Sequence, residues 1–251
     1  MAIILPSNSL AVTPFEITNS LQFDSGDSAH LTRTPGSTTN QKTYTLSVWV
    51  NTFSNSANKT IFNANTYPSE PRSTLSSEGV LQKRTNFRIA STSYGGVAGN
   101  LNHSQWYHIV WAIDTTQGTA GNRIKYYVDG TLVSWTLYDA ALALNLDTGT
   151  NSTVEHQIGE LAGLGWYWNG LMAEINFVDG SQLAPTEFAE DVGGTWKAKE
   201  YEGGYGTNGF HLDFKDSSDI GADVSGNGND WSPQNLASGD VTTDVPPYVG
   251  D

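Results

Sequence analysis

Residues 43–50 alternate strictly between two kinds of side chain. Tyr44, Leu46, Val48 and Val50 fall on one side of an extended chain, and two threonines, a serine and a tryptophan fall on the other. A period of two, rich in β-branched and aromatic residues, is typical of a β-strand with one face in a core. The pattern therefore predicts a strand over this segment.

A second segment, residues 106–113, is apolar on both sides, with Val110 and Ala112 opposite Ile109 and Trp111. A strand that is covered on both faces has this pattern, so we expect it to lie centrally in a sheet. The same reasoning predicts short strands at residues 60–62, 87–90 and 210–214.

Asp-Gly and Asn-Gly pairs indicate β-hairpins in two segments. The pair at 129–130 divides residues 123–133, and the pair at 169–170 divides residues 166–180. These dipeptides accept the positive φ angles of a type I′ turn, whose twist matches that of the flanking strands. We therefore expect each pair to connect neighbouring antiparallel strands.

Three further local predictions follow from turn and helix signals. Residues 21–31 are expected to form a strand, a turn and a second strand, and residues 51–81 a long polar loop with one short strand. A helix is expected over residues 184–190, because Pro185 suits a first turn and acidic residues follow it near the positive end of the helix dipole.

These elements predict an all-β fold, a single antiparallel two-sheet β-sandwich of the jelly-roll type. We expect an extended arm in residues 1–20, the sandwich in residues 21–192, and a Gly- and Asp-rich extension in residues 193–251 that packs on the sandwich. Self-similarity at a fixed period is absent from the sequence, which excludes a propeller or a solenoid.

Composition narrows the function. The chain of 251 residues has 12 Lys and Arg against 26 Asp and Glu, a formal net charge of −14. Nucleic-acid binding needs clustered cations, so nucleic acid is not an expected partner. The acidity either serves solubility or attracts divalent cations.

The sequence also bears on location. It has no cysteine, which excludes a disulfide-stapled module. Residues 1–6 reach a proline after a short apolar run without a basic region, so a signal peptide is not expected, and neither is membrane insertion. We expect synthesis in a cytosol, without export by a signal peptide.

Several phrases in residues 21–214 together resemble the laminin-G-like, concanavalin-A-like jelly-roll family. They are Leu21-Gln-Phe-Asp-Ser-Gly-Asp27, Tyr44-Thr-Leu-Ser-Val-Trp-Val50, Gln105-Trp-Tyr-His-Ile-Val110, Tyr126-Tyr-Val-Asp-Gly130 and Asn169-Gly-Leu-Met-Ala-Glu-Ile175. The resemblance implies a two-sheet sandwich that recognises glycans or proteins.

Two phrases of the extension, residues 196–210 and 223–231, resemble a variant found in proteins of marine tailed bacteriophages. That resemblance implies a virion surface protein: a tail fibre, a head fibre or a capsid decoration. The implied partners are other virion proteins, through the N-terminal arm, and a host-surface glycan. A closed homo-oligomer is expected, with a trimer as the first choice.

The resemblance also raises a calcium site. Many family members have Asp-Glu where this chain has Ala173-Glu174, and the loss of one carboxylate weakens a calcium site. Asp24, Asp27 and Asp213 are the candidate metal ligands that remain, the alternative being that the first two only serve a turn. No other cofactor is expected.

Catalysis is not expected. Hydrolases of related fold use Glu-x-Asp-x-x-Glu, and the nearest phrase here places Gln157 between Glu155 and Glu160, where the middle acid belongs. A retaining hydrolase needs two carboxyl groups about 5–5.5 Å apart with different pKa values, and the missing acid removes that tuning.

The candidate carbohydrate-binding residues are Trp166, Tyr167 and Asn169, because sugar rings stack on aromatic faces while their hydroxyls bond to amides. Core positions are the alternative for both aromatics, and Trp168 is expected in the core. We expect four aromatic residues to fasten the extension to the sandwich: Trp196, Tyr201, Tyr205 and Trp231.

The sequence thus favours a non-enzymatic virion surface protein with a lectin-like domain. The alternative is a free carbohydrate-binding lectin or a glycan-active enzyme of cellular origin. Hydrolysis of laminarin or agarose by the protein would favour the glycan-active enzyme over the virion protein.

Overall fold

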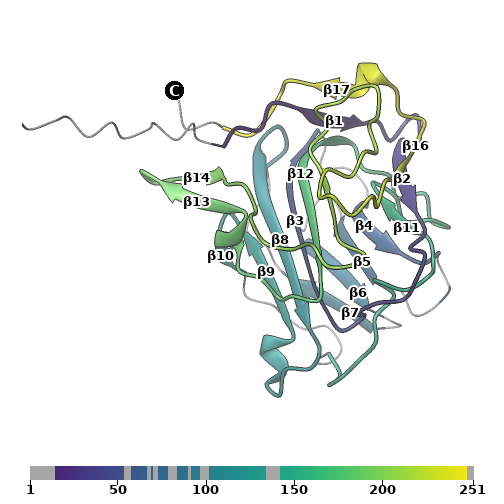
Figure 1. Cartoon of the computed structure of the whole chain (residues 1–251), viewed down its shortest axis with the longest axis vertical. Helices are drawn as coiled ribbons and strands as arrows, with labels where there is room; N and C mark the ends of the chain where they lie inside the picture. Colours follow the sequence, from purple (N-terminus) through teal and green to yellow (C-terminus); the bar gives the residue numbers. More distant parts are fainter. Residues whose placement is uncertain are drawn as a thin grey trace, which may run out of the picture.

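The computed structural model describes residues 15–53, 58–66, 69, 73–78, 84–89, 92–96, 102–133 and 142–247, with the backbone alone between residues 73 and 96. Two antiparallel sheets stack face to face, as Figure 1 shows. This confirms the predicted all-β sandwich of the jelly-roll type.

The larger sheet has the strand order β10-β9-β8-β3-β12-β1-β17, with β15 also beside β12. Its strands are β1 Ser20–Phe23, β3 Thr43–Thr52, β8 Trp106–Asp114, β9 Ile124–Val128, β10 Thr131–Leu132, β12 Gly170–Asp179, β15 Phe210–Leu212 and β17 Val241–Thr242.

The second sheet has the order β16-β2-β11-β4-β5-β6-β7. Its strands are β2 His30–Arg33, β4 Lys59–Ala64, β5 Ser73–Glu78, β6 Arg84–Ile89, β7 Thr92–Gly96, β11 His156–Ile158 and β16 Ser232–Gln234. A separate hairpin pairs β13 Ala189–Val192 with β14 Thr195–Ala198.

The two strands that the sequence indicated most strongly lie side by side. In the register of β3 and β8, Leu46 faces Trp111 and Val48 faces Ile109 across the strands. All but the ends of both strands are buried on both faces. The central position predicted for residues 106–113 is therefore confirmed.

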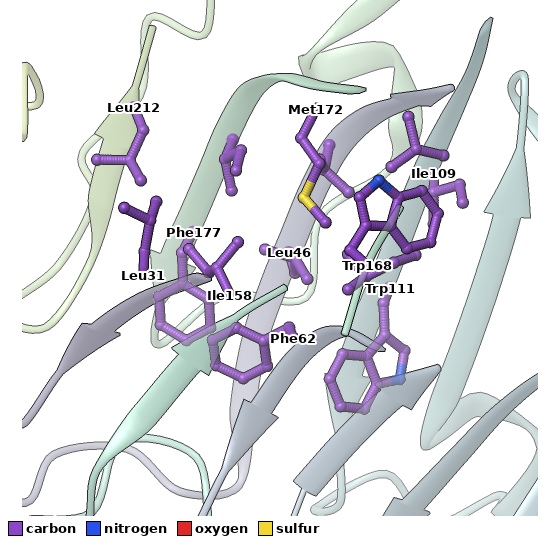
Figure 2. Close-up of a cluster of buried hydrophobic side chains, with 14 of the residues drawn as sticks. Leu31, Leu46, Phe62, Ile109, Trp111, Ile158, Trp168, Met172, Phe177 and Leu212 are labelled. Carbon is purple, nitrogen blue, oxygen red and sulfur yellow. The ribbon is translucent and has the colours of Figure 1, made fainter. Parts of the chain in front are cut away.

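Aromatic rings from the two sheets meet in the core. Phe62 of β4 stacks on Phe177 of β12 with ring centroids 5.9 Å apart, and Figure 2 shows these rings facing each other between the sheets. Phe177 also stacks on Phe210 at 5.4 Å. Trp168, 2% exposed, packs in the same cluster, as predicted.

A second apolar layer covers the outer face of the larger sheet. One cluster joins Ile17 and Trp49 to Ala189 of the β13–β14 hairpin, and another joins Val110 and Phe188 to the segment that follows the hairpin. Figure 1 shows this hairpin close to β9 and β10. The outer face of this sheet is therefore occupied by the chain itself.

His108 connects this layer to the sheet. Trp196 Nε1–H donates to His108 Nδ1 at 3.0 Å, so Nε2 carries the ring hydrogen and donates to Ser47 Oγ at 2.8 Å. The ring also stacks on Trp49 at 4.9 Å. Because burial of the neutral ring opposes a charge, it lowers the pKa of His108 to about 3.

The four aromatic residues that were expected to join the extension to the sandwich make the following contacts. Trp196 stacks on His108, Tyr201 packs on Phe188 at 5.0 Å, and Trp231 packs edge-on against Phe210 at 4.9 Å. Tyr205 O–H donates to Asn176 Oδ1 at 2.6 Å. Three of them, Trp196, Tyr201 and Tyr205, thus contact residues of the sandwich, whereas Trp231 packs on Phe210 within the extension itself.

The extension is also part of the sheets. The expected boundary at 192/193 falls in the turn between β13 and β14, and β15, β16 and β17 all pair with strands of the sandwich. At the other end of the chain, Ser20 begins β1 and Ile17 is buried.

One hairpin prediction is confirmed and one is wrong. Asp129 and Gly130 have φ angles of 44° and 74° and connect β9 to β10. The pair at 169–170 is not a turn between strands, because Gly170 begins β12 with a φ of 150°. A Cβ there would collide with the backbone of Asn51, so close approach of chains, and not a turn, requires this glycine.

Asp179 ends β12 and Gly180 follows with a φ of 91°. The next strand, β13, pairs with β14 and not with β12. The pair at 179–180 therefore leads out of the sheet.

The strands predicted in residues 21–31 belong to different sheets. β1 pairs with β12 in the larger sheet, whereas β2 pairs with β11 in the second. The turn between them, with Ser28 at a φ of 59°, carries the chain from one sheet to the other. Local pattern predicts strands and turns but not the sheet that each strand joins.

Two other predictions are corrected. The helix expected over residues 184–190 is only a 3-10 turn, Pro185–Glu187, and Ala189 already pairs with β14. Pairing and burial of Phe188 outweigh the helix-start signals. The polar segment 51–81 contains both β4 and β5 instead of one short strand.

The described residues include three 3-10 turns of three residues each. No helix in the part of the chain that the structure describes has the length and apolarity needed to cross a bilayer.

Candidate functional site

The candidate recognition residues lie at one end of the sandwich, which we call the loop end. It consists of the described residues 24–29, 53, 102–105 and 159–169, where β1 and β11 end and β3 passes into Phe53. Because Phe23 pairs with Gly170, the turn after β1 lies beside the segment that leads into β12. The sheet register therefore brings segments distant in sequence to one end.

Tyr167 is the centre of a cluster of polar side chains at this end. Ser28 and Glu160 lie close enough to its hydroxyl to act on its pKa, which Ser28 lowers and Glu160 raises. Its ring lies against His30, with centroids 5.8 Å apart. Burial raises the pKa of the Tyr167 phenol, and the negative charge of Glu160 raises it further. The ring is half-buried, so one side is held while another meets solvent.

His30 completes the network. Its Nδ1 lies 2.8 Å from the carbonyl oxygen of Ser28, and its Nε2 lies 3.1 Å from Oε2 of Glu160. Both ring nitrogens therefore face acceptors, and the side chains of the pair are only 15% and 12% exposed. Three side chains from three segments, Ser28, His30 and Glu160, thus surround one tyrosine.

The other candidate residues surround Tyr167. Trp166 is half-buried, and so is Asn169, whose backbone oxygen accepts a bond from Phe53 N–H at 3.0 Å. Two exposed apolar side chains flank them: Phe53 at 40% and Leu164 at 38% exposure. The loop end thus combines aromatic faces, amides and a carboxylate, which are the groups that recognise sugars.

A buried lysine lies beneath this surface. Lys59 Nζ–H donates to Thr52 Oγ1 at 2.9 Å, and Thr52 Oγ1–H donates to the Asn169 carbonyl at 3.4 Å. Lys59 is 5% exposed, and burial lowers the pKa of its amine to about 8. The amine supports the segment from inside and is not presented to a ligand.

The structure does not gather the three candidate calcium ligands. Asp24 Oδ1 accepts the Gly26 N–H at 2.7 Å, which is the turn role, and Asp27 is exposed in the same turn. Asp213 instead forms an ion pair with Lys215 at 3.1 Å. Among the described residues, no group of three or more His, Asp or Glu side chains has the arrangement of a metal site.

Glu174, which follows Ala173 in the sequence, lies away from the loop end. Glu174 occupies a β-bulge with a φ of 46°, and its Oε2 is 2.6 Å from His211 Nε2. Tyr205 stacks on that imidazole at 6.0 Å. Glu174 therefore joins β12 to β15 and takes no part in the loop end.

The two glutamates of the hydrolase-like phrase lie at opposite ends of β11. Glu155 Oε1 accepts a bond from Gln157 Nε2 at 2.8 Å, whereas Glu160 pairs with His30. Gln157 is itself buried and accepts a bond from Asn63. Each carboxylate has its own structural partner, so the two are not arranged as an acid and a nucleophile across one bond.

Sequence reasoning missed His30, Ser28 and the positioning role of Glu160. His30 had no partner at a metal-like spacing, and Glu160 was considered only as a catalytic acid. The pairing of Leu31 with Ile158 brings β2 beside the end of β11, and that pairing cannot be read from local pattern.

Comparison with known proteins agrees with this architecture. The sequence profile of the concanavalin A-like lectin/glucanases superfamily matches residues 24–187, well over half of the chain. A search with the sequence matches no curated protein.

Among solved structures, the chain is similar to a heptameric SAP-like pentraxin from Limulus polyphemus, with 15% identity, a TM-score of 0.50, and coverage of 68% of this chain and 80% of the pentraxin. Domain 4 of an arabinanase from Geobacillus stearothermophilus gives 16% identity, a TM-score of 0.43, and coverage of 58% and 64%.

Domains LG4-5 of the mouse laminin alpha1 chain give 14% identity, a TM-score of 0.45, and coverage of 72% of this chain and 47% of the laminin chain. This chain thus spans about half of the laminin chain and just under two thirds of the arabinanase domain. Identities this low show the fold alone.

Proposed function

Because this chain belongs to the concanavalin A-like lectin/glucanases superfamily, we propose that it is a non-catalytic glycan-recognition protein that binds through the loop end. The observation that carries the proposal is the network around Tyr167. A half-exposed aromatic ring held by Glu160, Ser28 and His30 is pre-organised, so binding costs little side-chain entropy.

The covered sheet supports this location. Trp49, Val110 and Val178 on the outer face of the larger sheet are all buried under residues 183–205 and the described part of the N-terminal arm. A sugar cannot reach that face while the hairpin is in place. The loop end keeps its aromatic side chains at the surface.

The non-catalytic part of the proposal rests on the carboxylates. Glu155 and Glu160 have separate structural partners, and Gln157 stands between them. Release of reducing ends from laminarin or agarose that disappears in Glu155→Gln would contradict this and favour a glycan-active enzyme.

We propose further that the protein is displayed on a phage virion, as a fibre or a capsid decoration, and works as a homo-oligomer. The support is the resemblance of residues 196–210 and 223–231 to marine phage proteins. Display in many copies also suits weak single sites, because avidity raises the overall affinity.

Deletion of residues 1–14 tests the docking role of the arm. The buried Ile17 remains in this variant, so we expect an unchanged melting temperature and loss of incorporation into particles. Incorporation at the level of the full chain would exclude the arm as the docking segment.

Substitution of the two aromatic residues tests recognition. Trp166→Ala and Tyr167→Ala are each expected to weaken binding to a host envelope polysaccharide about fivefold per site, since a stacked ring contributes on the order of 1 kcal/mol. Surface plasmon resonance on immobilised polysaccharide measures the loss.

Leu144→Ala is the matched control, because Leu144 is an exposed apolar residue at the opposite end of the sandwich, where Asn145 N–H bonds to the Thr115 carbonyl. It should bind like the wild type. Equal binding by all three folded variants would place recognition elsewhere.

A further inference from the structure

The loop end carries carboxylates close to its aromatic platform. Asp24 and Asp27 are exposed in the turn that also supplies Ser28, which lies near the Tyr167 hydroxyl. Glu160 pairs with His30, whose ring lies against Tyr167, and its charge acts on the same hydroxyl. Three acidic side chains therefore lie on the segments that hold the tyrosine.

The described segments of the loop end offer no lysine or arginine to balance the charge of these three carboxylates. The described segments 24–30, 53, 102–105 and 159–169 contain no lysine or arginine. Lys59 lies close by, but it is buried and its amine points to Thr52. The ring of His30 lies 3.1 Å from Glu160 and faces that carboxylate alone among the three.

The pKa of the Tyr167 hydroxyl shows the effect of this negative charge. After burial, the charge of Glu160 is what opposes a negative charge at this oxygen, as the raised pKa shows. A ligand anion placed against the ring would meet the same repulsion. It would also lose the arginine or lysine contacts by which proteins usually hold carboxylates and sulfates.

We propose that the loop end binds an uncharged, hydroxyl-rich sugar and rejects acidic sugars such as uronic, sialic and sulfated residues. The inference rests on the proposed glycan recognition and names its ligand class. Sugar hydroxyls donate to Glu160, while the C–H face of the ring stacks on Tyr167 and Trp166. Carboxylates without nearby cations suit such a donor-rich, neutral ligand.

The test uses the full chain on an array of bacterial surface polysaccharides at pH 8 with EDTA present. Each uronic-acid polysaccharide is printed beside its carboxyl-reduced form, in which a neutral hydroxymethyl group replaces each carboxylate. We expect neutral polymers and the carboxyl-reduced forms to bind at least fivefold more strongly than the acidic forms. Equal or stronger binding of the acidic forms overturns the inference but leaves glycan recognition intact.

Binding to no polysaccharide at all is a different result, because it contradicts the proposed function itself. A charge variant then localises the effect. Asp27→Asn is expected to raise binding of acidic forms about threefold and to leave neutral polymers within twofold, since Coulomb repulsion at this range is only partly screened.

Asp147→Asn is the matched control. It removes the same charge from an exposed site, 61% exposed and 3.4 Å from Lys42, at the opposite end of the sandwich. It should change neither class of polymer. An equal gain from both variants would mean that the overall net charge, and not the loop end, selects the ligand, and would overturn the inference.

Discussion

Replacement of Phe177 with alanine is expected to lower the free energy of unfolding by about 3–5 kcal/mol. Phe177 is 2% exposed and stacks on Phe62 of the opposite sheet, on Phe210 and on Tyr44. The cavity would separate the two sheets at their most aromatic contact, where neighbouring rings cannot collapse into the space. Urea denaturation followed by intrinsic fluorescence measures the change.

Phe53→Ala is the control for this experiment, because Phe53 lies at the surface. It should alter the free energy of unfolding by less than about 0.5 kcal/mol. A Phe177→Ala variant that stays within about 1 kcal/mol of the wild type would contradict the core packing described above.

Acidification below pH 6.5 is expected to destabilise the protein through two buried histidines. Burial lowers the pKa of His108 to about 3 and that of His156 to about 4. His156 is held neutral by its partners, since Asn151 N–H donates to Nε2 and Nδ1–H donates to the Val154 carbonyl. The folded state therefore disfavours protonation at both rings.

The sign follows from proton linkage. Between each folded pKa and the unfolded value of 6.5, the unfolded chain binds more protons, so the free energy of unfolding falls as the pH falls. Stability from these groups is complete above pH 6.5 and is lost toward pH 4. The two together should account for on the order of 4 kcal/mol at pH 4.5.

Denaturation at a series of pH values, with variants, measures this slope. His108→Asn should remove about half of the loss between pH 6.5 and 4.5, although it is less stable at neutral pH. A slope that is the same in His108→Asn as in the wild type would show that His108 does not titrate as described.

The strands and the sandwich could be predicted because burial leaves a local pattern. The period of two in residues 43–50 and the apolar run in residues 106–113 correspond to β3 and β8, and Asp129-Gly130 carries its turn geometry in its own residues. These features depend on neighbours in sequence.

Sheet membership could not be predicted in the same way. Nothing local shows that β1 and β2 separate at Ser28, or that Gly170 is a point of close approach instead of a turn. The helix start at Pro185 fails for a similar reason, because pairing of β13 with β14 is set by distant packing.

The candidate recognition residues were chosen by residue type and not by their partners. Trp166 and Tyr167 could be chosen because aromatic residues in a Gly-rich turn favour sugar contact. The network that orients Tyr167 comes from β2, the turn after β1 and the end of β11, so His30 and Ser28 gave no signal in the sequence. The register of the paired strands brings the candidate-site residues together, and their spacing along the sequence does not show this.

Hydroxyl-radical footprinting of the full chain, with and without a saturating host polysaccharide, tests glycan recognition at the loop end most directly. Trp166 and Tyr167 are half-buried there, and Tyr201, half-buried against Phe188 on the covered face, serves as an internal reference. The account predicts that bound polysaccharide slows oxidation of Trp166 and Tyr167 severalfold and leaves Tyr201 unchanged. Protection of Tyr201 with no change at Trp166 and Tyr167 would contradict it.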